Sequence, residues 1–427
     1  MSLRSALRGL ILLLTCLVMS FVLAACFSRT LIYGVDVYPA IISPDADGRD
    51  DVTLIQYNLR RNADVSIYLV DASGEKHYFR RNLPRSRSTG SGYHVYFGGV
   101  IDRSQGDLIR ARMLPSGEYT LVIEATDEQG RTEQVSKPLT LVNADTTYPQ
   151  LLGFGVDHRE FTPNRDGVHD RVKINYDLTK EATVLVYLIG EDGIKYPITE
   201  DEGPYSIVIA GEVGTHRYDY EGGVDLGAQP PPDGTYTLVA LAEDKVGNKE
   251  MVTDTLTIKD GGVPRARIVG LEWEVSDTII PLGSTMWITA TVENYGYTPI
   301  RTTGPAPGTV YTSDQNFNSL GWYQSSGAWR FGIDWASNPA YPYPFRWALG
   351  RPDELRAEVV DGETFYYLDP GQRVQVTGGI TILDPLPRNP DEFYAGLIHE
   401  DVWVVDDQVD PHWITVDAPP SGPWNQK

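Results

Sequence analysis

Two short stretches of the sequence gather oxygen-bearing side chains around a glycine. SPDADGRDD begins at Ser43, and TPNRDGVHD begins at Thr162. Hard cations such as calcium bind several oxygen ligands, and short Asp- and Asn-rich turns with a glycine supply them. The two stretches offer six candidate calcium ligands: Asp45, Asp47, Asp51, Asn164, Asp166 and Asp170.

A turn without a metal explains the same residues. Asp and Asn side chains accept hydrogen bonds from nearby backbone amides and thereby start a turn before a strand. The spacing departs from the EF-hand calcium loop, because Gly48 is fourth from Asp45 and Gln56 stands in the place of the bidentate glutamate. Calcium binding and a plain turn both stay open at this point, whereas acid–base catalysis is disfavoured because the motif recurs as a structural unit.

The two stretches belong to a tandem duplication. SPDADGRDDVTLIQYNL aligns with TPNRDGVHDRVKINYDL at an offset of 119 residues, for example from Asp47 to Asp166. ADVSIYL aligns with ATVLVYL, and PSGEYTLVIEATDEQG aligns further on with PDGTYTLVALAEDKVG. Within each copy, apolar residues alternate with polar ones and turn signals separate the runs, which predicts short antiparallel strands. The pattern predicts an all-β protein built from antiparallel β-sandwiches.

The repeated blocks resemble a known domain family. The run S/T-P-D/N-x-D-G-x-x-D, followed by I-x-Y-x-L, P-x-G-x-Y-T-L and A-x-D-x-x-G, is similar to the Ig-like domain of flagellar hook-cap proteins. The resemblance covers residues 36–148 and 149–262. It implies a β-sandwich used for spacing, assembly and binding, without a catalytic activity.

Residues 263–418 form a third region with different marks. PRARIVGLEWEV, IIPLGSTMWITATVENYG and YLDPGQRVQVTGGITI resemble, more loosely, the cell-adhesion-related Ig-like domains of bacterial surface proteins. We therefore expect three tandem Ig-like β-sandwich domains, with residues 419–427 as a tail.

The N-terminus predicts export and a lipid anchor. MSLRSALRG carries two arginines, an apolar run of residues 10–25 follows, and LAAC ends at Cys26. This pattern is typical of a secretory signal peptide, and the run is short of the roughly 20 residues that span a bilayer. LAAC resembles the bacterial lipobox, which implies cleavage after residue 25, acylation of Cys26, a tether over residues 26–35 and attachment to the membrane of the bacterial cell envelope.

Composition excludes several classes of function. Only Cys16 and Cys26 are present, so a mature chain beginning at Cys26 has no thiol for a disulfide or a thiolate metal site. The net charge of −22 argues against nucleic acid as a partner. Arginines 80, 81, 85 and 87 form a local exception and could contact lipid phosphates or wall polyanions, or remain in a solvated loop.

An aromatic-rich segment, residues 308–347, is the main candidate for ligand binding. Aromatic faces interleaved with amides and carboxylates suit sugar rings, and Tyr and Trp also dominate protein-binding surfaces. Burial in a core is the alternative for any of these aromatics. The candidate ligand-binding residues are Trp322, Tyr323, Trp329, Asp334, Trp335 and Trp347. The sequence thus predicts a non-catalytic surface protein, in which an Ig-like stalk presents a C-terminal domain for protein interaction, adhesion or envelope scaffolding. Carbohydrate binding through residues 308–347 is the alternative.

Overall fold

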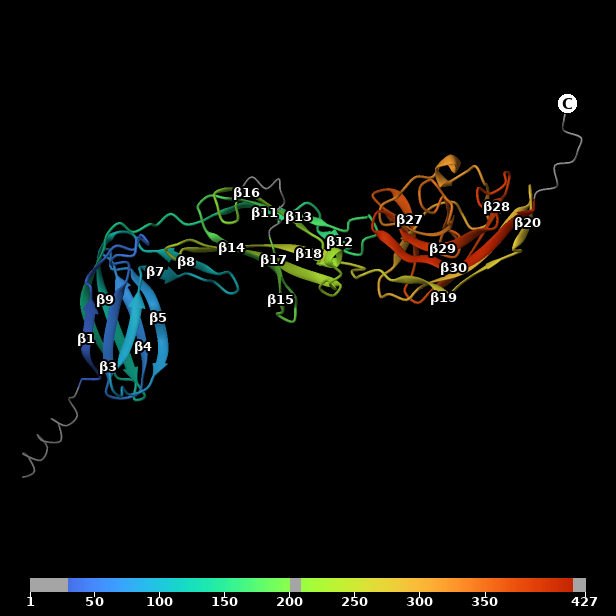
Figure 1. Cartoon of the computed structure of the whole chain (residues 1–427). Coiled ribbons are helices and arrows are strands. Elements are labelled where there is room, and N and C mark those ends of the chain that lie inside the picture. The colour runs from blue at the N-terminus through green and yellow to red at the C-terminus, as the bar shows by residue number, and fades with distance from the viewer. Residues whose placement is uncertain (1–29, 200–208, 418–427) are drawn as a thin grey trace, which may run out of the picture.

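The computed structural model describes residues 30–199 and 209–417, and this part of the chain is almost entirely β-structure. Three β-sandwich units follow one another along an elongated molecule (Figure 1). Two short 3-10 helices, η1 (Val224–Leu226) and η2 (Phe317–Leu320), complete the described secondary structure. Within the described residues, we find no helix with the length and hydrophobicity needed to cross a membrane. The all-β, multi-sandwich prediction is confirmed.

The first unit packs a three-stranded sheet against a five-stranded one. The smaller sheet has the order β1-β3-β6, with β1 at Ile32–Tyr38, β3 at Thr53–Leu59 and β6 at Tyr93–Phe97. The larger has the order β2-β10-β9-β4-β5, with strands Ile41–Ile42, Thr132–Leu141, Gly117–Asp127, Ala63–Val70 and Lys76–Arg85.

The second unit repeats this plan. Its smaller sheet has the order β11-β13-β16, with strands Leu151–Val156, Val172–Leu178 and Gly214–Tyr220. Its larger sheet contains β15, β14, β17 and β18, at Lys195–Ile198, Thr183–Ile189, Gly234–Glu243 and Lys249–Ile258, and β12 (Glu160–Phe161) pairs with β18.

The third unit is the largest. A four-stranded sheet has the order β19-β21-β28-β23, with strands Ala266–Val275, Thr285–Asn294, Arg373–Thr381 and Val310–Thr312. The facing sheet has the order β20-β30-β29-β24-β22-β27-β26, with strands Ile279–Pro281, Trp403–Asp417, Asp391–His399, Trp329–Trp335, Ile300–Thr302, Glu363–Leu368 and Arg356–Val360, and β25 (Phe345–Ala348) pairs with β24.

All three units begin in the same way. The first strand (β1, β11 or β19) pairs antiparallel within the smaller sheet, and the chain then crosses to the other sheet. There a short strand (β2, β12 or β20) pairs parallel with the last strand of the unit. A separate cluster of buried apolar side chains fills each sandwich. In the duplicated units, Tyr119 and Tyr236 each donate from the phenol to a carbonyl four residues earlier, so the copies also share this corner.

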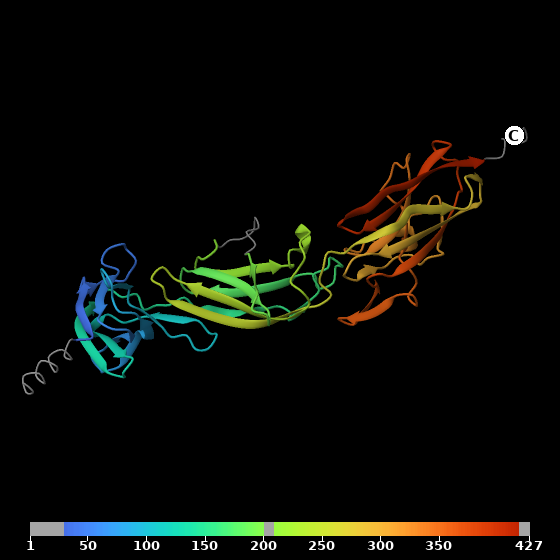
Figure 2. The ribbon, with the colours of Figure 1, turned by 90° about the horizontal axis from the view of Figure 1, so that it is seen from below.

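The first two units share a sheet. The hairpin β7 (Val100–Asp102) and β8 (Arg110–Met113) comes from the first unit, yet β8 pairs antiparallel with β18 and extends the larger sheet of the second unit. Both views show this hairpin bridging the two units, with the strands of the first unit running across the long axis of the second (Figures 1 and 2). Strand pairing therefore fixes the angle between them.

Side chains reinforce this junction. The backbone amide of Met113 donates to the Asn248 side chain at 2.7 Å, and the Arg112 guanidinium pairs with Glu250 and lies 3.7 Å from the Tyr148 ring centroid. On the outer face of the sheet, a small apolar cluster around Val239 packs against Ile109 of the hairpin. Charge pairing, stacking and apolar burial together hold the hairpin on its host sheet.

Candidate functional site

The first acidic turn, residues 43–51, is closed by its own side chains. The Asp51 carboxylate accepts hydrogen bonds from the amides of Ala46 at 2.7 Å and Gly48 at 2.9 Å. Asp45 and Asp47 accept from the amides two residues after each of them. One carboxylate oxygen from each of the three aspartates also lies within 4.8 Å of the other two. The geometry is that of an Asx turn, with oxygens grouped as calcium binding would need, and calcium stays a prediction.

The second turn has a similar set of hydrogen bonds, in which one donor to the last aspartate is shifted by one residue. Asp170 accepts from the amides of Asp166 and Gly167 at 3.0 and 2.7 Å, and the Asn164 and Asp166 side chains accept from amides two residues on. Backbone conformation repeats too, because Gly48 and Gly167 have φ angles of 86° and 81°. Both copies thus fold this motif into the same turn.

The surroundings of the two turns differ. Asp47 is exposed, whereas Asp166 and Asn164 are buried under the third unit. Arg301, on β22, donates to the backbone carbonyls of Asp166 and Ser326. Two flanking polar contacts join the same units, since Thr298 donates to the Asp260 carbonyl at 2.5 Å and Lys259 pairs with Glu358 at 2.7 Å. The second turn therefore forms the junction between the second and third units.

Close backbone packing marks this junction. A Cβ added at Gly167 would lie 2.1 Å from the Ser326 carbonyl oxygen, and one added at Gly327 would lie 2.1 Å from the Asp166 carbonyl carbon. Nothing lies within 4 Å of a Cβ added at Gly48. Glycine at 167 and 327 lets two backbones approach closely, and the equivalent position of the first turn has no such requirement.

Burial changes the electrostatics of the second turn. Desolvation, with a smaller contribution from the Asp170 carboxylate, raises the pKa of Asp166 to about 7. Across the junction, burial lowers the pKa of His399 to about 4, and a ring nitrogen of this histidine lies 2.8 Å from the Arg165 carbonyl oxygen. Asp166 lies at the wall of a cleft of about 620 Å³ between the two units, which is also lined by His169 and Asp361.

A buried charge cluster supports the third unit behind this junction. Arg330 and Arg346 are both buried and both contact Glu400, at 3.1 and 2.7 Å. Arg330 also donates to the carbonyls of Thr303 and Tyr323, at 2.6 and 2.8 Å. Since a buried charge is costly unless it is paired and hydrogen-bonded, these carbonyls offset part of that cost, while Arg330 Nη1 and one Glu400 oxygen have no hydrogen-bond partner. The cluster thereby fixes the loop that carries Tyr323.

Half of the predicted ligand-binding residues lie inside the third unit. Trp329 is 1% exposed and stacks on His399 with a ring-centroid distance of 4.5 Å. Trp347 is fully buried and donates to the Thr309 carbonyl at 3.0 Å. Asp334 is buried and accepts three hydrogen bonds from its own loop. These three side chains belong to the interior of the domain, so they cannot contact a ligand at its surface.

The other predicted residues reach the surface. Trp322 is 38% exposed and Tyr323 is 71% exposed. Tyr341 is also exposed, and its phenol oxygen accepts a hydrogen bond from Gln324 at 3.0 Å, so the two parts of the loop lie together. Trp335 is partly buried and lines a separate hollow of about 250 Å³. The accessible candidate surface is therefore Trp322, Tyr323 and Tyr341, of which the sequence prediction named the first two.

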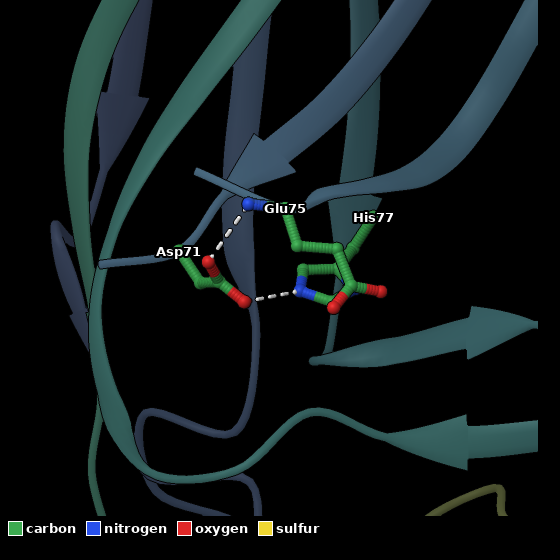
Figure 3. Close-up of side chains that lie close together, drawn as sticks. All are labelled: Asp71, Glu75 and His77. Carbon is green, nitrogen blue, oxygen red and sulfur yellow. Dashed lines mark hydrogen bonds and ion pairs between the residues drawn. The ribbon is translucent and has the colours of Figure 1, made fainter. Parts of the chain in front are cut away.

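A further polar cluster was not among the sites predicted from the sequence. Asp71, Glu75 and His77 meet at the turn between β4 and β5, where a ring nitrogen of His77 lies 2.9 Å from the Asp71 carboxylate (Figure 3). Asp71 also accepts from the Glu75 amide at 3.0 Å. The local spacing D-x-x-x-E-x-H was the available signal. The turn in the second copy has the same backbone hydrogen bonds without these side chains, so the fold does not require them.

Comparisons with known proteins identify no family. No family model matches the sequence, and no curated protein matches it. Among solved structures, a Ca²⁺-stabilised adhesin that helps an Antarctic bacterium bind ice aligns at 13% identity over 91% of this chain and 74% of its own, with a TM-score of 0.23. A titin fragment aligns at 12% over 86% and 93%, with a TM-score of 0.26. A Bacteroides ovatus glucan-utilisation protein, SGBP-B, in complex with a mixed-linkage heptasaccharide, aligns at 12% over 89% and 65%, with a TM-score of 0.16. At these scores none of them bears on the function of this chain.

Substituting alanine at Gly167 should open the junction between the second and third units. A positive φ costs a non-glycine residue about 1–2 kcal/mol at either turn. Only at Gly167 does the new Cβ also collide with Ser326, which adds about 1–3 kcal/mol of overpacking. Scanning calorimetry and small-angle X-ray scattering should show a lower melting temperature and a broader distribution of molecular dimensions for Gly167→Ala. Gly48→Ala is the matched control, and equal effects of the two changes would contradict this account of the junction.

Asp166→Asn should change how stability depends on pH. Folding raises the pKa of this carboxyl from an ordinary 3.8 to about 7, so the buried ionised form is unfavourable above pH 7, and the wild type regains stability as the pH falls from about 7 toward 4. Asparagine keeps the shape and is always neutral. The variant should therefore be more stable than the wild type at pH 8, by at most about 4 kcal/mol at about 1.4 kcal/mol per pKa unit, and the difference should vanish near pH 4.

Denaturant unfolding at a series of pH values, with a chelator present, measures this difference. His399 acts in the opposite direction, because its lowered pKa costs stability as the pH falls from 6.5 to about 4. Comparing variant with wild type at each pH removes that contribution. Asp47→Asn makes the same chemical change in the exposed turn and is the control. A difference for Asp166→Asn that is constant from pH 4 to 8 would show that Asp166 is not buried as the structure places it.

Proposed function

We propose that this chain is a non-catalytic, lipid-anchored protein of the bacterial cell envelope that presents its third domain at a fixed position for binding to another surface protein. The observation that carries the proposal is that specific contacts hold both junctions between the domains. A shared sheet joins the first two units, and a buried acidic turn joins the last two. Flexible tandem domains need neither feature. The likeness of the first two domains to hook-cap Ig-like repeats, a family used for spacing and assembly, agrees with this role.

The lipobox-like LAAC sequence supplies the anchor in this proposal. Cys26 lies outside the described residues, and Leu31, in the first described segment, is buried in the core of the first unit. Five residues of chain span at most about 17 Å. A lipid on Cys26 therefore keeps the first unit close to the membrane surface, and the two rigid junctions carry its orientation through to the third unit.

The loop bearing Trp322 and Tyr323 is the binding surface in this proposal. Buried Arg330 holds the Tyr323 carbonyl, and the capping box at Asn316 and Ser319 closes the short helix η2 before Trp322. Exposed aromatics on a fixed backbone lose little conformational entropy on binding, which favours them as contact residues.

Cys26→Ser should release the protein from the membrane. The wild type should partition into the membrane fraction, and mass spectrometry should find an acylated N-terminal Cys26. The serine variant cannot form the thioether and should stay unacylated, so the chain cleaved after residue 25 should appear in the soluble fraction. Cys16→Ser, within the predicted leader, is the matched control and should behave as the wild type. An unmodified Cys26 in the membrane-bound wild type would refute the anchor.

Carbohydrate binding is the second candidate, favoured by the exposed aromatic loop. Trp322, Tyr323 and Tyr341 present flat apolar faces beside the Gln324 amide, a combination that suits stacking with a sugar ring and hydrogen bonding to its hydroxyls.

A glycan array probed with the complete mature chain distinguishes the two candidates. If a glycan binds, Trp322→Ala should weaken the affinity about tenfold or more, as expected for a contact residue at the centre of a site. Trp287→Ala removes another exposed tryptophan, from β21 of the same domain, and should leave binding unchanged. The absence of binding to any glycan, or equal losses in both variants, would leave protein binding as the supported function.

A further inference from the structure

One flank of the first unit is positively charged, whereas the chain as a whole is strongly negative. Residues 76–101 contain Lys76 and four arginines but no aspartate or glutamate, within a protein of net charge −22. This stretch forms β5 and β6, which are the outermost strands of the two sheets on one side of the sandwich. Arg60, which follows β3 and lies over Tyr33 of β1, is at the same end of the sandwich as Arg85. We call Arg60, Arg80, Arg81, Arg85 and Arg87 together the basic flank.

The arginines of the basic flank have no acidic partners. None of the five forms an ion pair with a carboxylate in residues 30–199 or 209–417, whereas Arg61 and Arg131 nearby both pair with Asp127. Four of the guanidinium groups instead lie over aromatic rings. The distances to the ring centroids are 4.3 Å for Arg60 over Tyr33, 4.1 Å for Arg80 over Phe79, 4.0 Å for Arg81 over Tyr78 and 5.5 Å for Arg85 over Tyr93.

Stacking of this kind holds a guanidinium in place. No described group accepts from the N–H edges of Arg60 and Arg81, whereas one N–H group each of Arg80 and Arg85 donates to the carbonyl of the preceding residue, at 3.3 and 3.4 Å. The N–H edge of a guanidinium matches the oxygens of a phosphate group, which arginine recognises through paired hydrogen bonds. A carboxylate partner would occupy the same edge. The basic flank therefore presents several oriented phosphate-binding groups that no described carboxylate of the protein neutralises.

The basic flank reaches the end of the domain from which the chain runs to Cys26. The Arg60 amide donates to the Leu31 carbonyl at 3.0 Å, which places this arginine beside the first described residues. Arg85 pairs in register with Ala63, at the same end of the sandwich, and Ser88 donates to the Leu59 carbonyl there. The opposite end carries the Asp45–Asp51 turn and the hairpin that joins the second unit.

We propose that the basic flank binds the phosphate headgroups of anionic phospholipids in the membrane that carries the lipid anchor. The proposal rests on the anchor, because the chain between Leu31 and Cys26 spans at most about 17 Å and brings this end of the domain to the headgroups. Anionic headgroups attract arginines only within about one Debye length, near 8 Å at physiological salt. Exposed Asp64 and Glu128, and Glu133, which accepts from the Leu31 amide at 2.5 Å, lie at the same end, so only its arginine-bearing part would be attracted to anionic headgroups.

The arrangement would orient the whole molecule. The arginine-bearing end of the first domain would face the bilayer, and the shared sheet would set the direction in which the acidic second and third domains run from the first (Figure 1). A single flexible lipid tether cannot set such a direction, whereas several phosphate contacts on a rigid domain can.

Vesicle co-sedimentation of the mature chain carrying Cys26→Ser tests the proposal without the lipid. The unacylated protein should bind vesicles of phosphatidylcholine with phosphatidylglycerol, bind weakly to phosphatidylcholine alone, and be released by high salt. Each arginine near the surface contributes about fivefold, so a triple variant of three exposed arginines (R80Q, R81Q and R87Q) should bind about a hundredfold more weakly. Its matched control removes the same charge elsewhere, at three other exposed arginines: R103Q, R351Q and R388Q.

The outcomes separate this proposal from the anchor. Equal losses in the triple variant and its control would mean that net charge alone drives binding, and would overturn the proposal. No binding to the anionic vesicles at low salt, or binding only to a soluble polyanion such as polyphosphate, would overturn it as well. Because the vesicle assay uses unacylated protein, such a failure leaves the acylation of Cys26, measured by mass spectrometry, as an independent result.

Discussion

The contact between Arg301 and the second acidic turn is the constraint on which the arrangement of the domains depends. Its guanidinium joins the backbone of Asp166 to that of Ser326, and the glycines on both sides permit the approach. The partners on the third domain are themselves fixed. Gly327 donates to the Glu400 carbonyl, and the Glu400 side chain binds two buried arginines. Each contact at the junction is therefore supported by further polar contacts within the third domain, although Arg330 Nη1 and one Glu400 oxygen are buried without a hydrogen-bond partner.

The duplication allows the effect of this contact to be recognised, because the first copy has the same turn without a contact to another domain. The turn could be predicted from sequence, since its Asp, Asn and Gly positions dictate local hydrogen bonds, and so could the strands with alternating burial such as β3 and β13. The exposure of Asp47 and the burial of Asp166 could not be predicted from the sequence. Burial of Asp166 depends on Arg301, which lies 135 residues further along the chain. Only the tertiary packing decides which copy becomes an interface.

The aromatic segment shows a second limit of the sequence. Strand β24 is buried along almost its whole length, so Trp329 and Trp335 show no alternation that would separate core from surface. Burial on both faces produces this pattern in a central strand. Trp322 precedes that strand on a loop fixed by Arg330, and its exposure follows from this position. Likewise, no local pattern reveals that β8 leaves its own domain, because a strand of four residues pairs equally well with either neighbouring sheet edge.

Rigidity and charge together give the molecule a direction. Arginines that stack on aromatic rings and have no acidic partner lie on the first domain. The arginines at the two junctions instead form ion pairs with carboxylates or donate to backbone carbonyls. The described residues contain no cysteine, so these polar contacts and strand pairing across a domain boundary hold the domains together without disulfides. Binding of the first domain to a surface can orient the other domains only if they cannot rotate relative to it. If the first domain binds a membrane as proposed, the two junctions would pass its orientation on to the exposed aromatic loop of the third domain.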